Sequence, residues 1–175
     1  MTGRGRSSGF ATDTQADRAE PDSVPGYRIV KRKFATAPLS GEGARLFGGR
    51  WNSPGVPAVY LASSVAQAML EMLVHLDVQD GLKNYLVFTV LIPRDLIKSV
   101  PPGAVPPGWL RPIRIPASQQ FGDRFLAKQK HLVMSVPSVI VPGERNYVLN
   151  PLHPAIKRVR IRPGVKVGFD PRLRQ

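Results

Sequence analysis

The chain has 175 residues, which is long enough for one domain and short for two. It has no cysteine, so disulfides and thiolate metal sites are excluded, and no apolar run near ~18 residues, so no membrane-spanning helix is expected. Twenty-five Lys and Arg against 12 Asp and Glu give a net charge of +13. This charge favours polyanionic partners: nucleic acid, nucleotides, free phosphate or an acidic protein. The lack of cysteine suits a reducing compartment, and we expect a cytoplasmic location.

Residues 1–24 are small and polar and carry no apolar stretch of a secretory signal. We therefore predict a disordered extension over 1–24 and one folded domain over 25–175. Within this domain, short apolar and β-branched segments predict strands. They are YRIVK from residue 27, VPAVYLA ending at residue 62, residues 85–92, SVIV at 138–141, VRIRP at 159–163 and VKVGF at 165–169.

Two helices are predicted between these strands. Ser64 as N-cap, with Gln67 three residues later, fits a capping box for a helix that runs to about residue 77. The segment 121–131 predicts a second helix, after a proline-rich loop over 101–116. The mixture indicates an α+β fold, a single domain in which small twisted β-sheets are flanked by helices.

The first predicted helix carries one polar stripe. Ser64, Gln67, Glu71 and His75 share a face at the 3.6-residue period, and the other sides are apolar. Either this stripe faces water, or the helix is buried all round and Glu71 faces a cleft. Both interpretations remain open from the pattern alone.

A glycine-rich segment over 40–55 contains the motif GGRWN, Gly48 to Asn52. Two glycines let the backbone approach a ligand, and Arg50 could then hold a phosphate through its planar donors. The alternative is a glycine turn with a solvated Arg50 and a buried Trp51. Neither a P-loop nor GxGxxG after a strand occurs, which excludes the usual nucleotide-binding motifs.

The remaining candidates give weaker signals. His75, His131 and His153 lie far apart without metal-ligand spacing, so no metal site is predicted. Ser138 could belong to a nucleophilic triad, but no GxSxG elbow occurs, and the proline-bounded VPSVIVP is equally typical of a plain strand.

Taken in order, several segments resemble the RES domain, a family named for an Arg, a Glu and a Ser in its motifs. The resemblance covers about residues 26–173. The matching stretches are YRI from Tyr27, SGEGARLFGGRWN from Ser40, VYLASSVAQAMLEMLVHL from Val59, VPSVIVPGERNYVLNPLHP from Val136 and FDPRL near the C-terminus.

The resemblance implies a fold similar to the ADP-ribosyltransferases and an activity on NAD. RES proteins are toxins paired with an antitoxin that carries an Xre-type helix-turn-helix domain. They are described as NAD phosphorylases or glycohydrolases, and at least one as ADP-ribosylating a protein. The resemblance implies catalytic roles for Arg28, Glu71 and Ser138. It implies NAD binding by Arg28, Arg50, Tyr60, Ser138 and Asn150, with His153 in support.

The residue types suit this chemistry. When nicotinamide leaves NAD as a neutral pyridine, positive charge develops on the ribose, and the Glu71 carboxylate could stabilise it. Arg28 and Arg50 would bind the pyrophosphate. Tyr60 could pack against nicotinamide, and Ser138 could bind its carboxamide or a ribose hydroxyl.

Three functions remain open. The first is NAD cleavage by phosphate or water, without cofactor or metal; the abundance of arginine favours phosphate as co-substrate. The second is transfer of ADP-ribose to a protein. The third, argued from the charge alone, is a basic nucleic-acid-binding domain, although no ladder of aromatic residues supports it. For the toxin we expect contact with DNA only through the antitoxin and none with a membrane.

Overall fold

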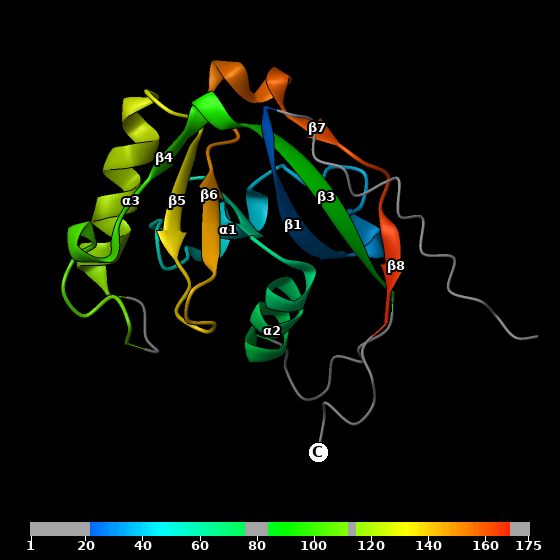
Figure 1. The fold of residues 1–175 in the computed structure, drawn as a ribbon, viewed down its shortest axis with the longest axis horizontal. Helices are drawn as coiled ribbons and strands as arrows, with labels where there is room; N and C mark the ends of the chain where they lie inside the picture. The colour runs from blue at the N-terminus through cyan, green and yellow to red at the C-terminus, as the bar shows by residue number, and fades with distance from the viewer. Residues whose placement is uncertain (1–21, 76–83, 112–114, 169–175) are drawn as a thin grey trace, which may run out of the picture.

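In the computed structural model, residues 22–75, 84–111 and 115–168 are described (Figure 1). Most of the predicted extension lies outside these ranges, as do the expected end of the first helix near residue 77 and the FDPRL stretch. Ser23 and Val24, which we predicted in the extension, belong to the first strand. The α+β class and the single domain are confirmed.

Eight strands and three α-helices make up the described structure. In chain order they are β1 (Ser23–Lys31), α1 (Glu42–Phe47), β2 (Val59–Ala62), α2 (Val65–His75), β3 (Tyr85–Pro93), β4 (Ile97–Ser99), α3 (Pro116–Lys128), β5 (Val133–Pro137), β6 (Arg145–Leu149), β7 (Arg160–Ile161) and β8 (Val165–Val167). Short 3-10 turns follow β1, β3, β4 and β6. No helix within the described ranges is long and apolar enough to cross a membrane.

The strands form one continuous sheet rather than the several small sheets that we expected. Its order is β4-β5-β6-β2-β1-β3-β7, with β8 also on β3, and only β4 and β5 pair in parallel. β1 pairs with β3 along its whole length, from Ser23 opposite Pro93 to Lys31 opposite Tyr85, but β1 and β2 are joined through one pair, Tyr27 and Ala62. The sheet is therefore almost divided in two at this junction.

The sheet curls so that its two halves pack on each other. Along β2, β5 and β6, side chains alternate between two clusters, as the two-residue period of a strand requires. One set, with Val133 and Leu149, packs with Val90 and Ile92 of β3. The other set packs with Trp51 and with Leu126 of α3, the helix beside β4 and β5 at the left of Figure 1. Both faces of these strands are thus buried.

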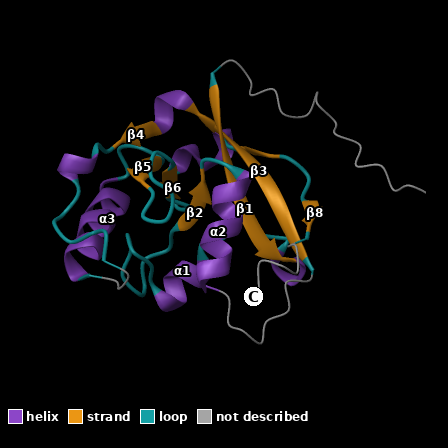
Figure 2. Ribbon diagram, turned by 60° about the horizontal axis from the view of Figure 1, so that its bottom comes forward, coloured by secondary structure: helices purple, strands orange, loops and turns teal. Residues whose placement is uncertain are grey.

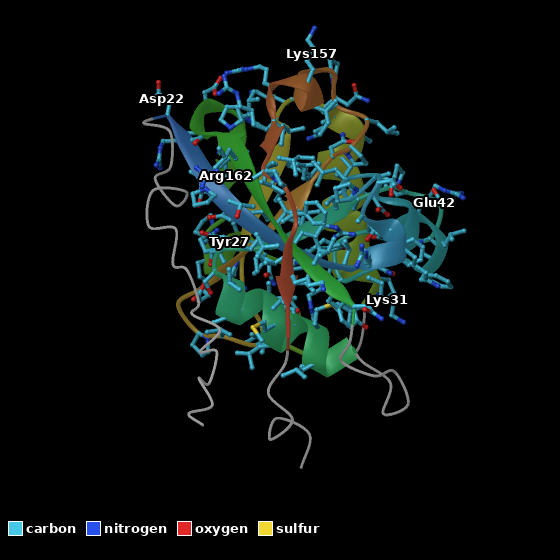
Figure 3. The ribbon with its side chains drawn as sticks, turned by 90° about the vertical axis from the view of Figure 1, so that its right-hand side faces the viewer. Asp22, Tyr27, Lys31, Glu42, Lys157 and Arg162 are labelled. Carbon is cyan, nitrogen blue, oxygen red and sulfur yellow. The ribbon has the colours of Figure 1, made fainter. Side chains whose placement is uncertain are left out.

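Helix α2 lies against the other half of the sheet, beside β1 in Figure 2. Its Ala68, Met69 and Met72 pack with Ile29 of β1 and Tyr85 of β3. In Figure 3, Asp22 and Lys31 mark the two ends of β1, and α2 lies below the strands. The packing places α2 next to the junction between β1 and β2.

Several predicted elements need correction. The predicted strand at 138–141 is a turn, while β5 and β6 on either side of it were not predicted. Helix α3 begins at Pro116 instead of residue 121, because proline is favourable in a first helical turn. Helix α1 occupies part of the segment that we predicted as glycine-rich loop.

Candidate active site

Arg28 lies on β1 beside the junction where β1 and β2 separate. Its Nη1 donates to the Tyr60 backbone carbonyl at 2.9 Å, so the side chain reaches β2 just beyond the single backbone pair. Burial lowers the pKa of Arg28 to about 10. Its buried Nε has no hydrogen-bond partner within the described ranges. A buried guanidinium that still has an unused hydrogen-bond donor is suited to binding an anion.

Tyr60 of β2 connects Arg28 to the GGRWN loop. While its carbonyl accepts from Arg28, its hydroxyl accepts from the Trp51 backbone N–H at 3.0 Å and donates to Asn52 Oδ1 at 2.7 Å. Gly49 packs on this phenol, since a Cβ there would lie 2.8 Å from Tyr60 Cζ. One residue thus fixes two arginine-bearing segments relative to each other.

The GGRWN loop is held rigidly from a second side by α3. Gln119 donates to the Gly49 and Asn52 carbonyls at 3.1 and 3.2 Å, and Asp123 accepts from both the Ser53 N–H and its hydroxyl. Gly122 faces the Trp51 carbonyl so closely that a Cβ would lie 2.7 Å from its carbon. Trp51 is buried, as one interpretation of the motif required. The loop is therefore part of the core.

Arg50 projects from this loop and is half-buried rather than solvated. Its Nη1 donates to the carbonyls of Trp109 and Arg111 at 2.5 and 2.8 Å. Burial lowers the pKa of Arg50, while the Glu71 carboxylate and the Tyr60 phenol act in the opposite direction. Arg50 therefore lies within electrostatic range of both Glu71 and Tyr60.

Helix α2 begins as predicted but uses its polar residues differently. Ser64 Oγ accepts from the Gln67 N–H at 3.1 Å, which confirms the N-cap. The Gln67 side chain returns to the Ser63 N–H at 2.8 Å, one residue before the position that a capping box requires. The expected reciprocal bond of the capping box is therefore replaced by a bond to the preceding residue.

As far as Glu71, the polar stripe of α2 faces the protein instead of water. Gln67 is 1% exposed, and Glu71 is half-buried and accepts from Asn146 Nδ2 of β6 at 2.8 Å. The exposed side chains are instead apolar: Leu70 is 42% and Val74 63% exposed. The helix is thus neither solvated along its stripe nor buried all round, and its carboxylate points inward.

Ser138 lies in a turn that docks on the start of α2. Its buried Oγ accepts from the N–H groups of Ile140 and Val141 at 3.2 and 3.0 Å, and its N–H donates to the Glu144 carbonyl. The Glu144 carboxylate accepts from Ser64 Oγ at 3.0 Å. The turn that carries Ser138 is therefore tied to the helix that carries Glu71, although their side chains make no hydrogen bond to each other.

Asn150 and His153 lie together at the end of α3. The Asn150 amide donates to the Leu126 carbonyl at 2.9 Å and accepts from the Leu152 N–H at 3.0 Å. His153 Nδ1 accepts from a backbone N–H, so its Nε2 carries the proton and donates to the Gln129 carbonyl at 2.9 Å. Both side chains bind backbone, and their hydrogen bonds do not reach Glu71 or the arginines. Asn150 and His153 therefore support the site by stabilising the fold around it.

Sequence reasoning missed the polar residues that hold the site. Asn52 is buried and donates to the carbonyls of Ala44 and Val56, and Asn146 contacts Glu71. Both asparagines stand inside motifs that carried the family resemblance. The sequence around an asparagine in a strand or loop nevertheless does not indicate which group its side-chain amide will bind.

The assembled groups define the chemistry that the region can perform. Two arginines that are partly withdrawn from water suit a phosphate-bearing ligand, and one inward carboxylate suits a centre that becomes positive. Over the described residues, no group of His, Asp or Glu could hold a metal ion. The arrangement is thus suited to electrostatic catalysis on a phosphorylated substrate.

The chain is similar to known proteins. The RES domain model matches residues 25–170. The chain is 37% identical over 150 residues to "Toxin Res" of Yersinia enterocolitica, covering 85% of this chain and 98% of that protein. It is 39% identical over 145 residues to the "Prs ADP-ribosylating toxin" of a Sphingobium species, covering 81% and 90%.

A solved structure is also similar. The crystal structure of the Mycobacterium tuberculosis MbcT–MbcA toxin–antitoxin complex matches with a TM-score of 0.68 at 25% identity, covering 83% of this chain and 85% of that one. By sequence, MbcT of this organism, named an NAD(+) phosphorylase, is 63% identical over 35 residues, 19% of each chain.

Proposed function

The chain belongs to the RES domain family, and from this premise we propose that it is a toxin that destroys NAD by cleaving the nicotinamide–ribose bond. The observation that carries the proposal is that Arg28 and the loop of Arg50 are both hydrogen-bonded to Tyr60, while Glu71 lies within electrostatic range of Arg50. The names of the relatives support it, since they describe a toxin, an NAD(+) phosphorylase and an ADP-ribosylating toxin. All three names fit a site that opens the same bond.

In this proposal the two arginines bind the pyrophosphate of NAD. Arg28 offers a buried guanidinium with a free Nε, and Arg50 a second one on a rigid loop. Because these segments are fixed by Tyr60, the phosphates would be positioned rather than only attracted. The Tyr60 hydroxyl is engaged with the loop, so this residue would contact nicotinamide through its ring.

Glu71 then acts on the reacting ribose. As the C–N bond to nicotinamide breaks, its electron pair leaves with the pyridine nitrogen, which becomes neutral, and the ribose carbon becomes cationic. A fixed carboxylate beside that carbon lowers the barrier electrostatically. Ser138 would bind the carboxamide or a ribose hydroxyl through its remaining hydroxyl proton, because its oxygen already accepts two backbone N–H groups.

The acceptor distinguishes the two activities that the site can support. Attack by inorganic phosphate gives ADP-ribose 1″-phosphate, attack by water gives ADP-ribose, and attack by a side chain gives a modified protein. We propose phosphate or water as acceptor. The name of the Sphingobium relative favours protein modification as the second candidate.

Incubation of the pure protein with labelled NAD, with and without phosphate, tests the proposal. Release of nicotinamide is expected, together with one of the two small products. Label transferred to an added protein extract, without free ADP-ribose, would support the second candidate. Intact NAD in every mixture would contradict both, and retention of a nucleic acid by the same protein would then favour a basic binding domain.

Glu71→Gln tests the assigned role directly. The variant keeps the side-chain volume and an oxygen that can accept from Asn146, so the fold should persist. NAD turnover is expected to fall ~10²–10³-fold, as for loss of one preorganised electrostatic group. The assay is nicotinamide release from a variant of unchanged melting temperature, and near wild-type turnover would refute the role.

A toxin that consumes NAD needs restraint, and we propose an antitoxin of the Xre helix-turn-helix class as partner. The similar solved structure is a toxin–antitoxin complex, which supports a partner of this kind. An acidic segment of the antitoxin would occupy the arginines and block NAD, while DNA binding stays with the antitoxin. Competition between NAD and antitoxin is expected, with association that slows as salt rises. Simultaneous, independent binding would contradict occlusion.

A further inference from the structure

A chain of side-chain amides leads from the start of α2 to Glu71. Gln67 Oε1 accepts from the Ser63 N–H at 2.8 Å, and Gln67 Nε2 donates to Asn146 Oδ1 at 2.7 Å. Asn146 Nδ2 in turn donates to Glu71 Oε1 at 2.8 Å. Glu71 Oε2 has no hydrogen-bond partner in the part of the chain that the structure describes. The carboxylate is thus held by one oxygen and open at the other.

The direction of every bond in this relay follows from its first member. A backbone N–H can only donate, so the Ser63 N–H must face the Gln67 oxygen. The Gln67 nitrogen then faces Asn146 and requires its oxygen, which leaves the Asn146 nitrogen for Glu71. The fold therefore presents a donor, never an acceptor, to the carboxylate.

The relay is also fixed in position. Asn146 lies on β6, an interior strand, where it pairs with Ala62 of β2 and Val136 of β5. Gln67 is 1% exposed, so water cannot easily replace its bonds. A donor on such a support orients a carboxylate with little loss of side-chain entropy during the reaction.

We infer that Asn146, with its orientation set by Gln67, is a positioning residue for Glu71. It would hold Oε1 so that Oε2 faces the ribose carbon. The inference rests on the proposed function. It assigns no contact between Asn146 and NAD.

Two variants change the relay without altering Glu71. Asn146→Asp replaces the donor by a second carboxylate oxygen. Gln67→Glu keeps the bond from the Ser63 N–H but presents an acceptor to Asn146, whose amide must then turn its oxygen toward Glu71. Loss of a hydrogen bond to a charged group corresponds to ~10- to 100-fold in kcat. The KM for NAD should change less than about threefold, because the arginines are untouched.

The decisive measurement is a double-mutant cycle with Glu71→Gln, using nicotinamide release and the melting temperature of each variant. Asn146→Asp should lower kcat ~10- to 100-fold alone, but less than about twofold when Glu71 is already Gln. Ser118→Ala is the matched control, because Ser118 Oγ is buried in α3 without a hydrogen-bond partner among the described residues, and the turnover of this variant should stay at the wild-type level.

The outcomes distinguish a failure of the role of Asn146 from a failure of the proposed function. An equal loss in both backgrounds would make Asn146 merely structural and overturn the inference, as would no loss in either. If Asn146→Asp does not fold, Gln67→Glu is put through the same cycle with the same two criteria. Wild-type protein that leaves NAD intact, or Glu71→Gln with full activity, would overturn the proposed function and this inference with it.

Discussion

Arg28→Met should make the protein more stable and a poorer binder of NAD at the same time. Methionine keeps an unbranched stem of similar length but removes the charge. The Arg28 guanidinium is buried, its Nε lacks a partner, and no described carboxylate forms an ion pair with it. Replacing an uncompensated buried charge by an apolar group is commonly neutral or stabilising.

The magnitude follows from the pKa of Arg28, which burial lowers well below its usual range, to about 10. One pKa unit corresponds to 1.4 kcal/mol, so keeping the group charged costs the folded state at most ~3 kcal/mol. The lost bond to the Tyr60 carbonyl offsets roughly 1–2 kcal/mol of this. We expect a net gain of ~1–2 kcal/mol in the free energy of unfolding, or about 3–6 °C in melting temperature.

The pH dependence has a defined sign. A cation whose pKa is lower in the folded than in the unfolded state destabilises the fold at every pH below about 10, and the cost disappears as pH rises from about 10 toward the ordinary pKa of arginine. The gain from Arg28→Met should therefore be constant between about pH 6 and 9. Denaturant unfolding at several pH values measures this.

Arg158→Met is the matched control. Arg158 is about half exposed and donates to both Asp95 carboxylate oxygens at 3.0 Å, so its loss should cost less than about 1 kcal/mol and leave NAD binding unchanged. NAD should bind ~10- to 100-fold more weakly to Arg28→Met, by calorimetry on a Glu71→Gln background that does not turn over. A less stable Arg28→Met protein with normal NAD affinity would refute the reasoning.

Two further substitutions test the rigid loop. Arg50→Ala should weaken NAD binding by roughly 1.5–3 kcal/mol and also lower stability by about 1 kcal/mol, since Arg50 donates to two backbone carbonyls; the exposed Arg45→Ala is its control, and unchanged affinity would make Arg50 structural. Gly122→Ala should cost ~3 kcal/mol or more by chemical denaturation, because the new Cβ would overlap the Trp51 carbonyl. A fully stable Gly122→Ala protein would contradict the tight packing of α3 on the loop.

Local sequence patterns predicted the elements whose ends are determined by residues within or beside the element itself. The Ser64 cap gave the start of α2, and the run that ends at Pro93 gave β3 close to its observed bounds. β5 was not predicted because all four residues of 133–136 are buried, so the alternation of apolar and polar residues that marks a half-exposed strand is missing. The turn at Ser138 was not predicted because it is held by hydrogen bonds to a serine hydroxyl, which is a weaker turn signal in a sequence than glycine or proline.

The site was predicted residue by residue, but not as an arrangement. Arg28, Arg50, Tyr60 and Glu71 came from family motifs, and the structure brings them to one region. For Ser138 and Asn150, roles in NAD binding stay predictions, because their described bonds serve a turn and the end of α3. Gln67 and Asn146 are 79 residues apart, and no local pattern could have paired them.

What no segment shows alone is why these residues meet. β1 and β2 pair once and then separate, and α2 follows β2 after two residues, so the chain must turn where the sheet divides. The backbone groups beside this division need other partners, and Arg28 supplies one by donating to the Tyr60 carbonyl. The Arg28 guanidinium, which makes this bond where the backbone pairing stops, is thereby held next to the helix that carries Glu71. The interruption in strand pairing is therefore also the place where the proposed anionic substrate would bind.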